Sequence, residues 1–391
     1  MIEIVVAFIG FVLIVGALQD AFEVVLLPRR VERRVRFMHY FFRATWAVWS
    51  RLGRLLPAGI RREGFLGIYG PLSMVLLFGC WAISIVIGFG FLQWALQAKP
   101  VLTMGPTLAS QLYLSGDTFF TLGYESLAFR TDLSHILIII EAGTGFGFIA
   151  LMVSYLPVLY HDFSQRDAQI IQLDARAGSP PTAGTLLHRH AVLGDLETLN
   201  QWLRDWEVWA SELIESHSSY PMLAFYRSQH QNQSWLASLA VMLDCCTLII
   251  PGVEDILLLQ AGSTFAAARR VLIEISRSLD VTPQLMTDTK RVSAAALAET
   301  EQMLLAAGWR WTGGAEVEEM IAALRASYEP MLEGLSSYLV LPLPTWIANN
   351  DVSARDGRKS LVWRLTQIQL SEISGAADGS QPDQAFSGKH D

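Results

Sequence analysis

Three long apolar runs dominate the first half of the chain, at residues 4–27, 64–98 and 133–160. At about 1.5 Å per residue, each run is long enough to cross a hydrocarbon core of about 30 Å as a helix. The second run exceeds one span, so we place its crossing after Pro71, at residues 72–96. Glu3 precedes the first run and the sequence LLPRR follows at its end, unlike the basic start and small-residue exit of a cleaved signal peptide. The pattern therefore predicts three retained transmembrane helices.

Threonine, glycine and one aspartate gather between the second and third runs, in the sequence SGDTFFTLGYESL of residues 115–127. Residues 100–132 are too polar to span a membrane and too apolar for an ordinary external loop. Non-helical backbone at membrane depth persists only where protein buries it or where it lines a water-filled path. We therefore predict a short re-entrant helix at 107–120 and an extended return at 121–125. Carbonyls of this return could replace the water shell of a monovalent cation, with positive φ at alternate residues.

The TLGY sequence, with Thr118 three residues before Thr121, resembles the Thr-Val-Gly-Tyr-Gly filter of the potassium channel superfamily. The similarity is greatest to bacterial pore modules with two helices and one pore loop, and it covers residues 72–160, under a quarter of the chain. The resemblance implies K⁺ as the permeating ion and a bacterial inner membrane location. Because one chain supplies one filter strand, a closed ring implies a homotetramer. The implied filter positions are Thr121, Leu122, Gly123, Tyr124 and Glu125, with Asp117 and Thr118 as filter support.

The sequence departs from the family pattern at the outer end of the filter. Glu125 stands where the second filter glycine is expected, and Ser126 replaces the usual following aspartate. A non-glycine residue in the left-handed region costs about 1–2 kcal/mol. A ring of Glu125 carboxylates would attract K⁺ and Na⁺ alike, so we expect cation preference with weakened K⁺ selectivity. The alternative is that Glu125 points into the outer vestibule and the filter behaves normally.

The third run contains an ionisable residue, Glu141, and an ionisable residue inside a span is by default functional. Helical spacing places Glu141 and Gly145 on one face, and the small residues of a second face suit close packing against the second span. We therefore expect Glu141 to line an inner cavity, with Gly145 where the superfamily keeps its hinge glycine. The alternative pairs Glu141 with the neighbourhood of Asp20 or Glu23, or with His135. The small-residue face comprises Gly143, Gly147, Ala150 and Ser154.

The second half of the chain has a helical pattern with little strand signal. Leu199, Trp202, Trp206, Trp209 and Leu213 recur at helical spacing and read as a buried stripe. The apolar sequence SLAVMLDCCTLII is too short to span and contains Asp244, so it predicts a buried helix. Together the elements predict an all-α membrane protein: three transmembrane helices, a re-entrant pore helix and filter, and an α-helical cytoplasmic domain. The predicted parts are an N-terminal transmembrane helix (1–28), a basic cytoplasmic amphipathic segment (29–63), a pore domain (64–161), a helical cytoplasmic domain (162–372) and a disordered tail (373–391).

Composition and charge support a membrane protein and give it an orientation. Apolar residues make up 52% and charged residues 17% of the chain, against about 25% charged in soluble domains. Ten arginines lie between the first and second runs, whereas only Lys99 and Arg130 lie between the second and third. Basic loops stay cytoplasmic, so we expect the N-terminus outside and the second half in the cytoplasm. The arginine-rich, aromatic segment 29–62 predicts an amphipathic helix on anionic lipid, the alternative being a cytosolic connector with a packed face.

The remaining sequence offers little other chemistry. His188, His190 and the Cys245–Cys246 pair lack zinc-type spacing, and no nucleotide-binding or hydrolase motif is found. We therefore expect no metal, cofactor, nucleic acid or enzymatic activity. The favoured hypothesis is a passive, tetrameric cation channel, with K⁺ or Na⁺ and membrane lipids as its partners. The alternative is a non-conducting membrane signalling or scaffold protein that retains a pore-like fold.

Overall fold

The computed structural model describes residues 1–25, 37–97, 107–123, 132–178, 180–193, 196–228, 233–252, 258–284, 291 and 294–346. These ranges contain α-helices and one 3₁₀ helix, and no strand. The predicted tail at 373–391 lies outside them. The expected all-α fold is confirmed for the described part of the chain.

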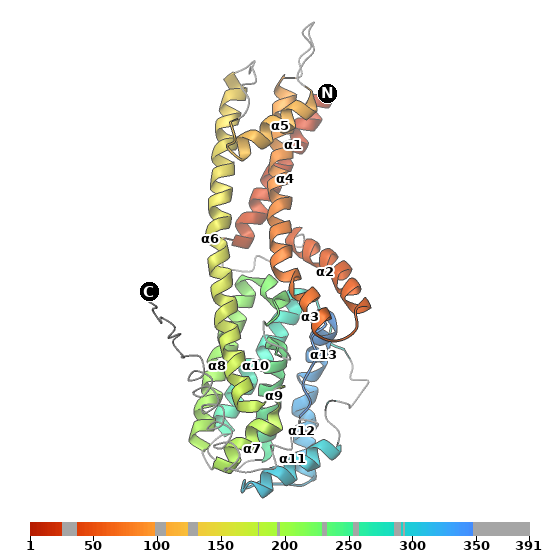
Figure 1. The fold of residues 1–391 in the computed structure, drawn as a ribbon, viewed down its shortest axis with the longest axis vertical. Coiled ribbons are helices and arrows are strands. Elements are labelled where there is room, and N and C mark those ends of the chain that lie inside the picture. The colour runs from red at the N-terminus through yellow and green to blue at the C-terminus, as the bar shows by residue number, and fades with distance from the viewer. Residues whose placement is uncertain are drawn as a thin grey trace, which may run out of the picture.

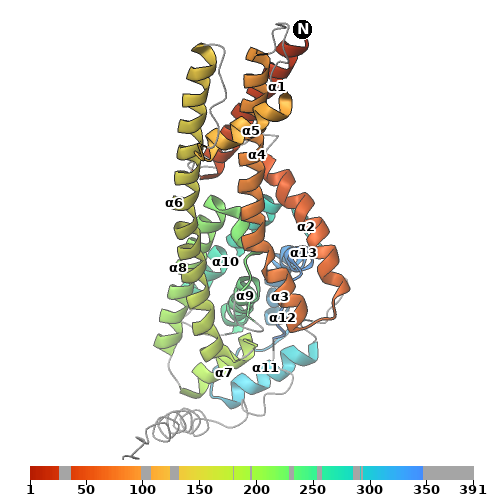
Figure 2. The same ribbon diagram turned by 45° about the horizontal axis from the view of Figure 1, so that its top comes forward.

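The molecule is elongated, with two groups of helices joined along its length (Figure 1). One group holds α1 (Ile2–Val25), α4 (Tyr69–Gln97), the short α5 (Leu108–Phe119) and the first half of α6 (Asp132–Ala177). The other holds the smaller helices that follow α6, with α2 and α3 beside them, and the view in Figure 2 keeps this division. The second group comprises α2 (Phe37–Leu55), α3 (Ile60–Gly67), α7 (Ala183–Leu193), α8 (Leu196–Ser219), η1 (Pro221–Phe225), α9 (Trp235–Gly252), α10 (Leu258–Leu279), α11 (Ala294–Ala306), α12 (Ala315–Ala326) and α13 (Glu329–Leu339).

Four helical stretches are long and apolar enough to cross a membrane, which makes this a membrane protein. The three that match the apolar runs are α1, α3–α4 (Ile60–Leu96) and α6, and only 17%, 33% and 22% of their most apolar windows are buried. The fourth is α9, whose window is 89% buried inside the protein. The prediction that this sequence forms a buried helix is confirmed.

α1 and α4 cross at a pair of glycines. A Cβ on Gly10 would lie 2.6 Å from the carbonyl oxygen of Gly88, and a Cβ on Gly88 would lie 2.7 Å from the carbonyl oxygen of Gly10. Small residues of this kind allow two apolar helices to approach at backbone distance. Trp81 of α4 donates its indole N–H to Asp20 of α1 at 2.8 Å, so this carboxylate is held within the same helix pair.

α6 is continuous over 46 residues, or about 69 Å. The predicted boundary between the pore and cytoplasmic parts, at 161/162, falls inside this helix, so the two parts are joined by helix and not by a linker. The buried stripe of α6 also continues across the boundary, through Leu159, Phe163, Ile170 and Leu173. Pro157 lies inside the helix close to this boundary, and the helix continues through it.

The core of the second helix group forms around α8, α9 and α10. All five residues of the predicted stripe on α8 are buried, as expected. A buried ion pair crosses this core, because Arg291 donates to both carboxylate oxygens of Asp244 at 2.8 and 2.6 Å. The hydroxyl of Tyr328 donates to the Asp244 carboxylate at 2.6 Å, and the burial of Tyr328 raises the pKa of this hydroxyl. A charge pair without this full set of partners would destabilise the fold.

The short helix η1 connects the two groups. Phe225 of η1 stacks on Phe42 of α2 with ring centroids 5.8 Å apart, and it lies 5.3 Å from the ring of Tyr69 at the start of α4. On the other side, buried Arg166 of α6 donates to the carbonyl oxygens of Leu223 and Tyr226 at 2.9 and 2.8 Å. Burial lowers the pKa of Arg166 to about 10 although Asp167 opposes this, so it stays cationic at neutral pH. Helices α2, α4 and α6 are therefore tied to one short turn.

Protein covers one face of α2, which belongs to the segment 29–62 expected on anionic lipid, and contact of that segment with lipid stays a prediction. In α2, Phe42 and Trp46 are buried by protein, and the Trp46 indole donates to the carbonyl oxygen of Tyr338 at 2.9 Å. This packing agrees with the alternative, a cytosolic connector with a packed face. The opposite face of α2 still exposes apolar side chains, among them Val48 and Leu52, and residues 29–36 lie outside the described ranges.

Candidate functional site

The short helix α5 occupies the position predicted for a re-entrant helix. Thr107 caps its first turn by accepting the Ser110 backbone N–H at 3.2 Å, and Phe120 follows its last residue. These ends match the predicted range 107–120, so the short helix is confirmed. In Figure 1, α5 lies crosswise between α4 and α6, and it contacts both of them.

The backbone turns sharply directly after α5. Thr121 has φ of 52° and Gly123 has φ of 72°, so two alternate residues lie in the left-handed region. The N–H of Thr121 donates to the carbonyl oxygen of Thr118 at 3.1 Å, and that of Leu122 donates to Asp117 at 2.9 Å. For threonine this conformation costs about 1–2 kcal/mol. These two hydrogen bonds, with a left-handed residue directly after the helix, form the common C-terminal turn of an α-helix.

The described part of the predicted filter thus differs from a strand. The expectation of an extended segment that starts at Thr121 is wrong for the described residues, because the N–H of Thr121 still donates to the end of α5. The alternation of positive φ matches the pattern expected of carbonyls that point the same way. Both Thr121 and Leu122 are exposed in the single chain. Tyr124, Glu125 and Ser126 lie outside the described residues.

The two residues predicted to support the filter, Asp117 and Thr118, contact the turn at residues 121–122 through their backbone. The carbonyl oxygens of Asp117 and Thr118 accept the hydrogen bonds of Leu122 and Thr121 just described. Asp117 is itself buried, 6% exposed, against the neighbouring helices. The turn is therefore held by the last residues of α5, and the position of α5 sets the position of the turn.

Glu141 anchors α5 to α6. Its side chain is fully buried and accepts a hydrogen bond from the hydroxyl of Ser115, which also lies 2.7 Å from the carbonyl oxygen of Val86. The expectation that Glu141 lines an inner cavity is therefore wrong, because it faces α5 and α4. The alternative pairing with Asp20, Glu23 or His135 is not the contact observed either. Its Oε2 atom has no hydrogen-bond partner among the described residues.

Gly145 lies one turn further along α6, where the end of α5 approaches most closely. A Cβ on Gly145 would lie 2.1 Å from the carbonyl oxygen of Phe119, two residues before Thr121. Only glycine allows this approach of helix to backbone. Gly145 therefore has a packing role, and the hinge role implied by the resemblance stays a prediction.

The two faces of α6 have exchanged the roles expected of them, since the small-residue face was expected to pack against the second span and the Glu141 face to line a cavity. The face with Glu141, Gly145 and Phe148 packs against the rest of the chain, whereas a Cβ on Gly143 or Gly147 would meet nothing within 4 Å. The reason is that Ser115 and the Phe119 carbonyl supply partners for the first face. The small-residue face is left free for contacts outside the single chain.

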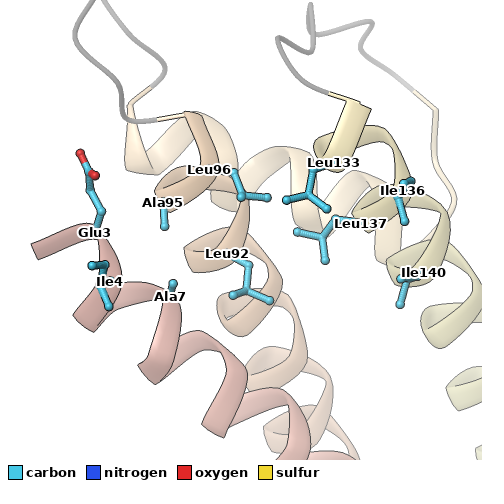
Figure 3. Close-up of a pocket in the computed structure, with 10 residues that line it drawn as sticks. All are labelled: Glu3, Ile4, Ala7, Leu92, Ala95, Leu96, Leu133, Ile136, Leu137 and Ile140. Atoms are coloured by element: carbon cyan, nitrogen blue, oxygen red, sulfur yellow. The ribbon is translucent and has the colours of Figure 1, made fainter. Parts of the chain in front are cut away.

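An apolar crevice of about 380 Å³ lies between the start of α1, the end of α4 and the start of α6. Figure 3 shows Leu92 and Leu96 of α4 opposite Leu133 and Leu137 of α6. Among the described residues of its lining, Glu3 is the one charged side chain, and it lies at the edge of the view.

Sequence reasoning missed Ser115 and Phe119. Ser115 carries a detectable signal, because a small polar residue in an apolar helix must find a hydrogen-bond partner. Phe119 acts through its carbonyl oxygen, and no side-chain pattern reveals a backbone contact of that kind. No known protein family, curated protein or solved structure matches this chain. The resemblance to potassium channels therefore rests on the pore-loop residues and the helices around them.

The contact between Glu141 and Ser115 leads to a prediction. Glu141→Ala should lower the free energy of unfolding by about 2–4 kcal/mol, since it opens a buried cavity and leaves Ser115 without this acceptor. Glu141→Gln keeps the volume and an acceptor oxygen, so it should retain most of the stability. Thermal unfolding of the purified protein in detergent compares the two variants. Equal loss in both would show that the hydrogen bond to Ser115 is not what Glu141 supplies.

Proposed function

We propose that this chain is one subunit of a cation channel of the potassium-channel type. The observation that carries the proposal is the pair of left-handed residues, Thr121 and Gly123, directly after a short helix held between two apolar helices. A ring of such turns would direct backbone carbonyls toward a shared axis, where they replace the water around a monovalent cation. Tyr124 and Glu125 would continue this filter outward.

The short helix α5 supports the same function through its dipole. The C-terminal end of a helix carries partial negative charge. The end of α5 points into the region directly before Thr121, where a cation would leave the filter. Several α5 ends around one axis would stabilise a cation there without a charged side chain. Glu141, which holds α5 in place, would then act on conduction by positioning it.

The proposed topology places α1, α4 and α6 across the membrane, with the N-terminus outside and the helices after α6 in the cytoplasm. The arginine asymmetry of the loops supports this orientation. Residues 29–36 and the exposed face of α2 would contact anionic lipid, because protein covers the other face of α2. A bacterial inner membrane is part of the proposal.

A homotetramer is the expected assembly. The single chain leaves Thr121, Leu122 and the small-residue face of α6 exposed, which suits contacts between copies around an axis. Native mass measurement in detergent should show a species of about 174 kDa, four times the 43.5 kDa of the chain. A monomer as the largest species would contradict the proposal, since one chain cannot enclose a pore.

The second candidate function is a non-conducting membrane signalling or scaffold protein with a pore-like fold. Glu125 favours it, because glutamate stands where the filter glycine is expected. Under the channel proposal the same residue weakens discrimination between K⁺ and Na⁺. Ion flux separates the two functions, because a scaffold of this fold would assemble and yet carry no current.

A further inference from the structure

A large pocket lies on the cytoplasmic side, between the α2–α3 hairpin and the second helix group. Its volume is about 960 Å³, within the range of small-molecule sites. One wall comes from the hairpin, with Arg54 and Arg62, and the other from α13 and the segment before α9. Figures 1 and 2 both draw α3 beside α13. We refer to it as the hairpin pocket.

The charge of the hairpin pocket is opposite to that of the whole protein. Among the described residues of its lining, Arg54, Arg62 and Arg227 are basic and Glu63 alone is acidic. This is a net charge of +2 in a chain whose net charge is −8. Burial lowers the pKa of Arg227, and the like charge of Arg62 lowers it further, against the opposing effect of Glu63. Arg62 and Arg227 thus line the same pocket with one carboxylate between them in the described lining, an arrangement that suits a bound anion.

The three arginines are held in place by protein carbonyl groups. Arg54 donates to the carbonyl oxygen of Ser337 at 2.8 Å. Arg62 donates to Leu56 at 3.1 and 2.9 Å through two nitrogens. Each guanidinium carries five N–H donors, more than these contacts use. Fixed guanidinium groups with spare donors suit the oxygens of a phosphate group.

Arg227 is the most deeply placed of the three. Its side chain is 8% exposed and pairs with Glu63, which is 47% exposed. The same guanidinium donates to the carbonyl oxygens of Leu339 and Val340 at 2.8 and 2.9 Å. Glu63, the partly exposed partner of the buried Arg227, could therefore be replaced by an anion that enters the pocket.

A further polar group belongs to the same lining. The Oε1 atom of Gln233 is buried and has no hydrogen-bond partner among the described residues. A buried amide oxygen without a partner costs about 1–3 kcal/mol. An organic ligand with a hydroxyl or amino group beside its phosphate would satisfy it.

We propose that the hairpin pocket binds an organic anion through a phosphate group, with Arg62 and Arg227 as its main contacts. The bound anion would tie the α2–α3 hairpin to α13. Only Ile68 separates α3 from α4, so the ligand would restrain the base of a membrane helix. This effect on ion flux rests on the proposed function, whereas binding itself does not.

The test measures binding of inorganic pyrophosphate to the full-length protein in detergent by calorimetry. We expect saturable binding that weakens at least about tenfold in Arg62→Gln and Arg227→Gln, which corresponds to 1.4 kcal/mol for one lost charged contact. Arg51→Gln removes an exposed charge from the same hairpin outside the pocket, so it should bind as the native protein does. Glu63→Gln removes the competing carboxylate and should bind several-fold more tightly, which keeps the test decisive if Arg227→Gln fails to fold.

A second arm distinguishes a soluble phosphate compound from a lipid headgroup. Short-chain phosphatidylglycerol is titrated into the same protein and variants, with short-chain phosphatidylcholine as the zwitterionic control. Binding of phosphatidylglycerol but not pyrophosphate, lost in Arg62→Gln, would identify the lipid headgroup as the source. Absence of binding by both probes, or equal binding by native protein and Arg62→Gln, would overturn the proposal. Neither outcome depends on whether the protein conducts ions.

Discussion

Gly145→Ala is expected to reduce cation flux at least about tenfold. The new methyl group would lie 2.1 Å from the carbonyl oxygen of Phe119, so α5 and the turn after it must move. Overpacking of this kind costs about 1–3 kcal/mol, and 1.4 kcal/mol at the filter corresponds to a tenfold change. Flux into liposomes, normalised to the amount of inserted protein, measures the effect.

Gly79→Ala is the matched control for this substitution. Gly79 lies within α4, where an added Cβ would meet nothing within 4 Å, so the same change in helix propensity occurs without a clash. Alanine is favoured over glycine inside a helix by about 1 kcal/mol. Flux through Gly79→Ala should therefore equal that of the native protein. If Gly145→Ala also conducted normally, the contact between α6 and the end of α5 would not set the filter position.

Gly123→Ala is expected to abolish conduction while the protein still assembles. An added Cβ would meet nothing within 4 Å at this residue, so the effect comes from its φ of 72° and not from packing. Alanine disfavours this conformation by about 1–2 kcal/mol, and relaxation would turn a filter carbonyl away from the axis. Thr121→Ala should likewise lose ion preference, since it removes the hydroxyl at the inner end of the filter.

Gly308→Ala supplies the control for backbone strain alone. Gly308 has φ of 90° and open space around its Cα, but it lies between α11 and α12, far along the chain from the filter. It should lose about as much stability as Gly123→Ala and conduct normally. Equal flux in both variants, with unchanged ion preference, would mean that residues 121–123 do not form a filter.

Much of the fold could be predicted, because length and periodicity decide it. The apolar runs became α1, α4 and α6, and the stretch with Asp244 became the buried helix α9. The continuation of α6 past residue 160 was missed, although Phe163, Ile170 and Leu173 keep the helical spacing of the buried stripe. Polar residues at the membrane edge obscured that spacing.

The candidate site could be predicted only in part. Helical spacing separated the two faces of α6, but a single helix does not reveal which face meets a partner. The choice depended on Ser115 and on the Phe119 carbonyl, which lie on another element. The same limit applies to α2, whose sequence is apolar on two faces and could not indicate that protein covers the one with Trp46.

The central claim is that four copies of this chain conduct cations through residues 121–125. The most direct measurement is the reversal potential of purified protein in a planar bilayer, under opposed gradients of K⁺ and Na⁺ and with a separate chloride gradient. We expect currents that follow the cation gradients and ignore chloride, with weak preference for K⁺ over Na⁺. Protein that is tetrameric and folded but carries no cation current would contradict the account and leave the non-conducting scaffold.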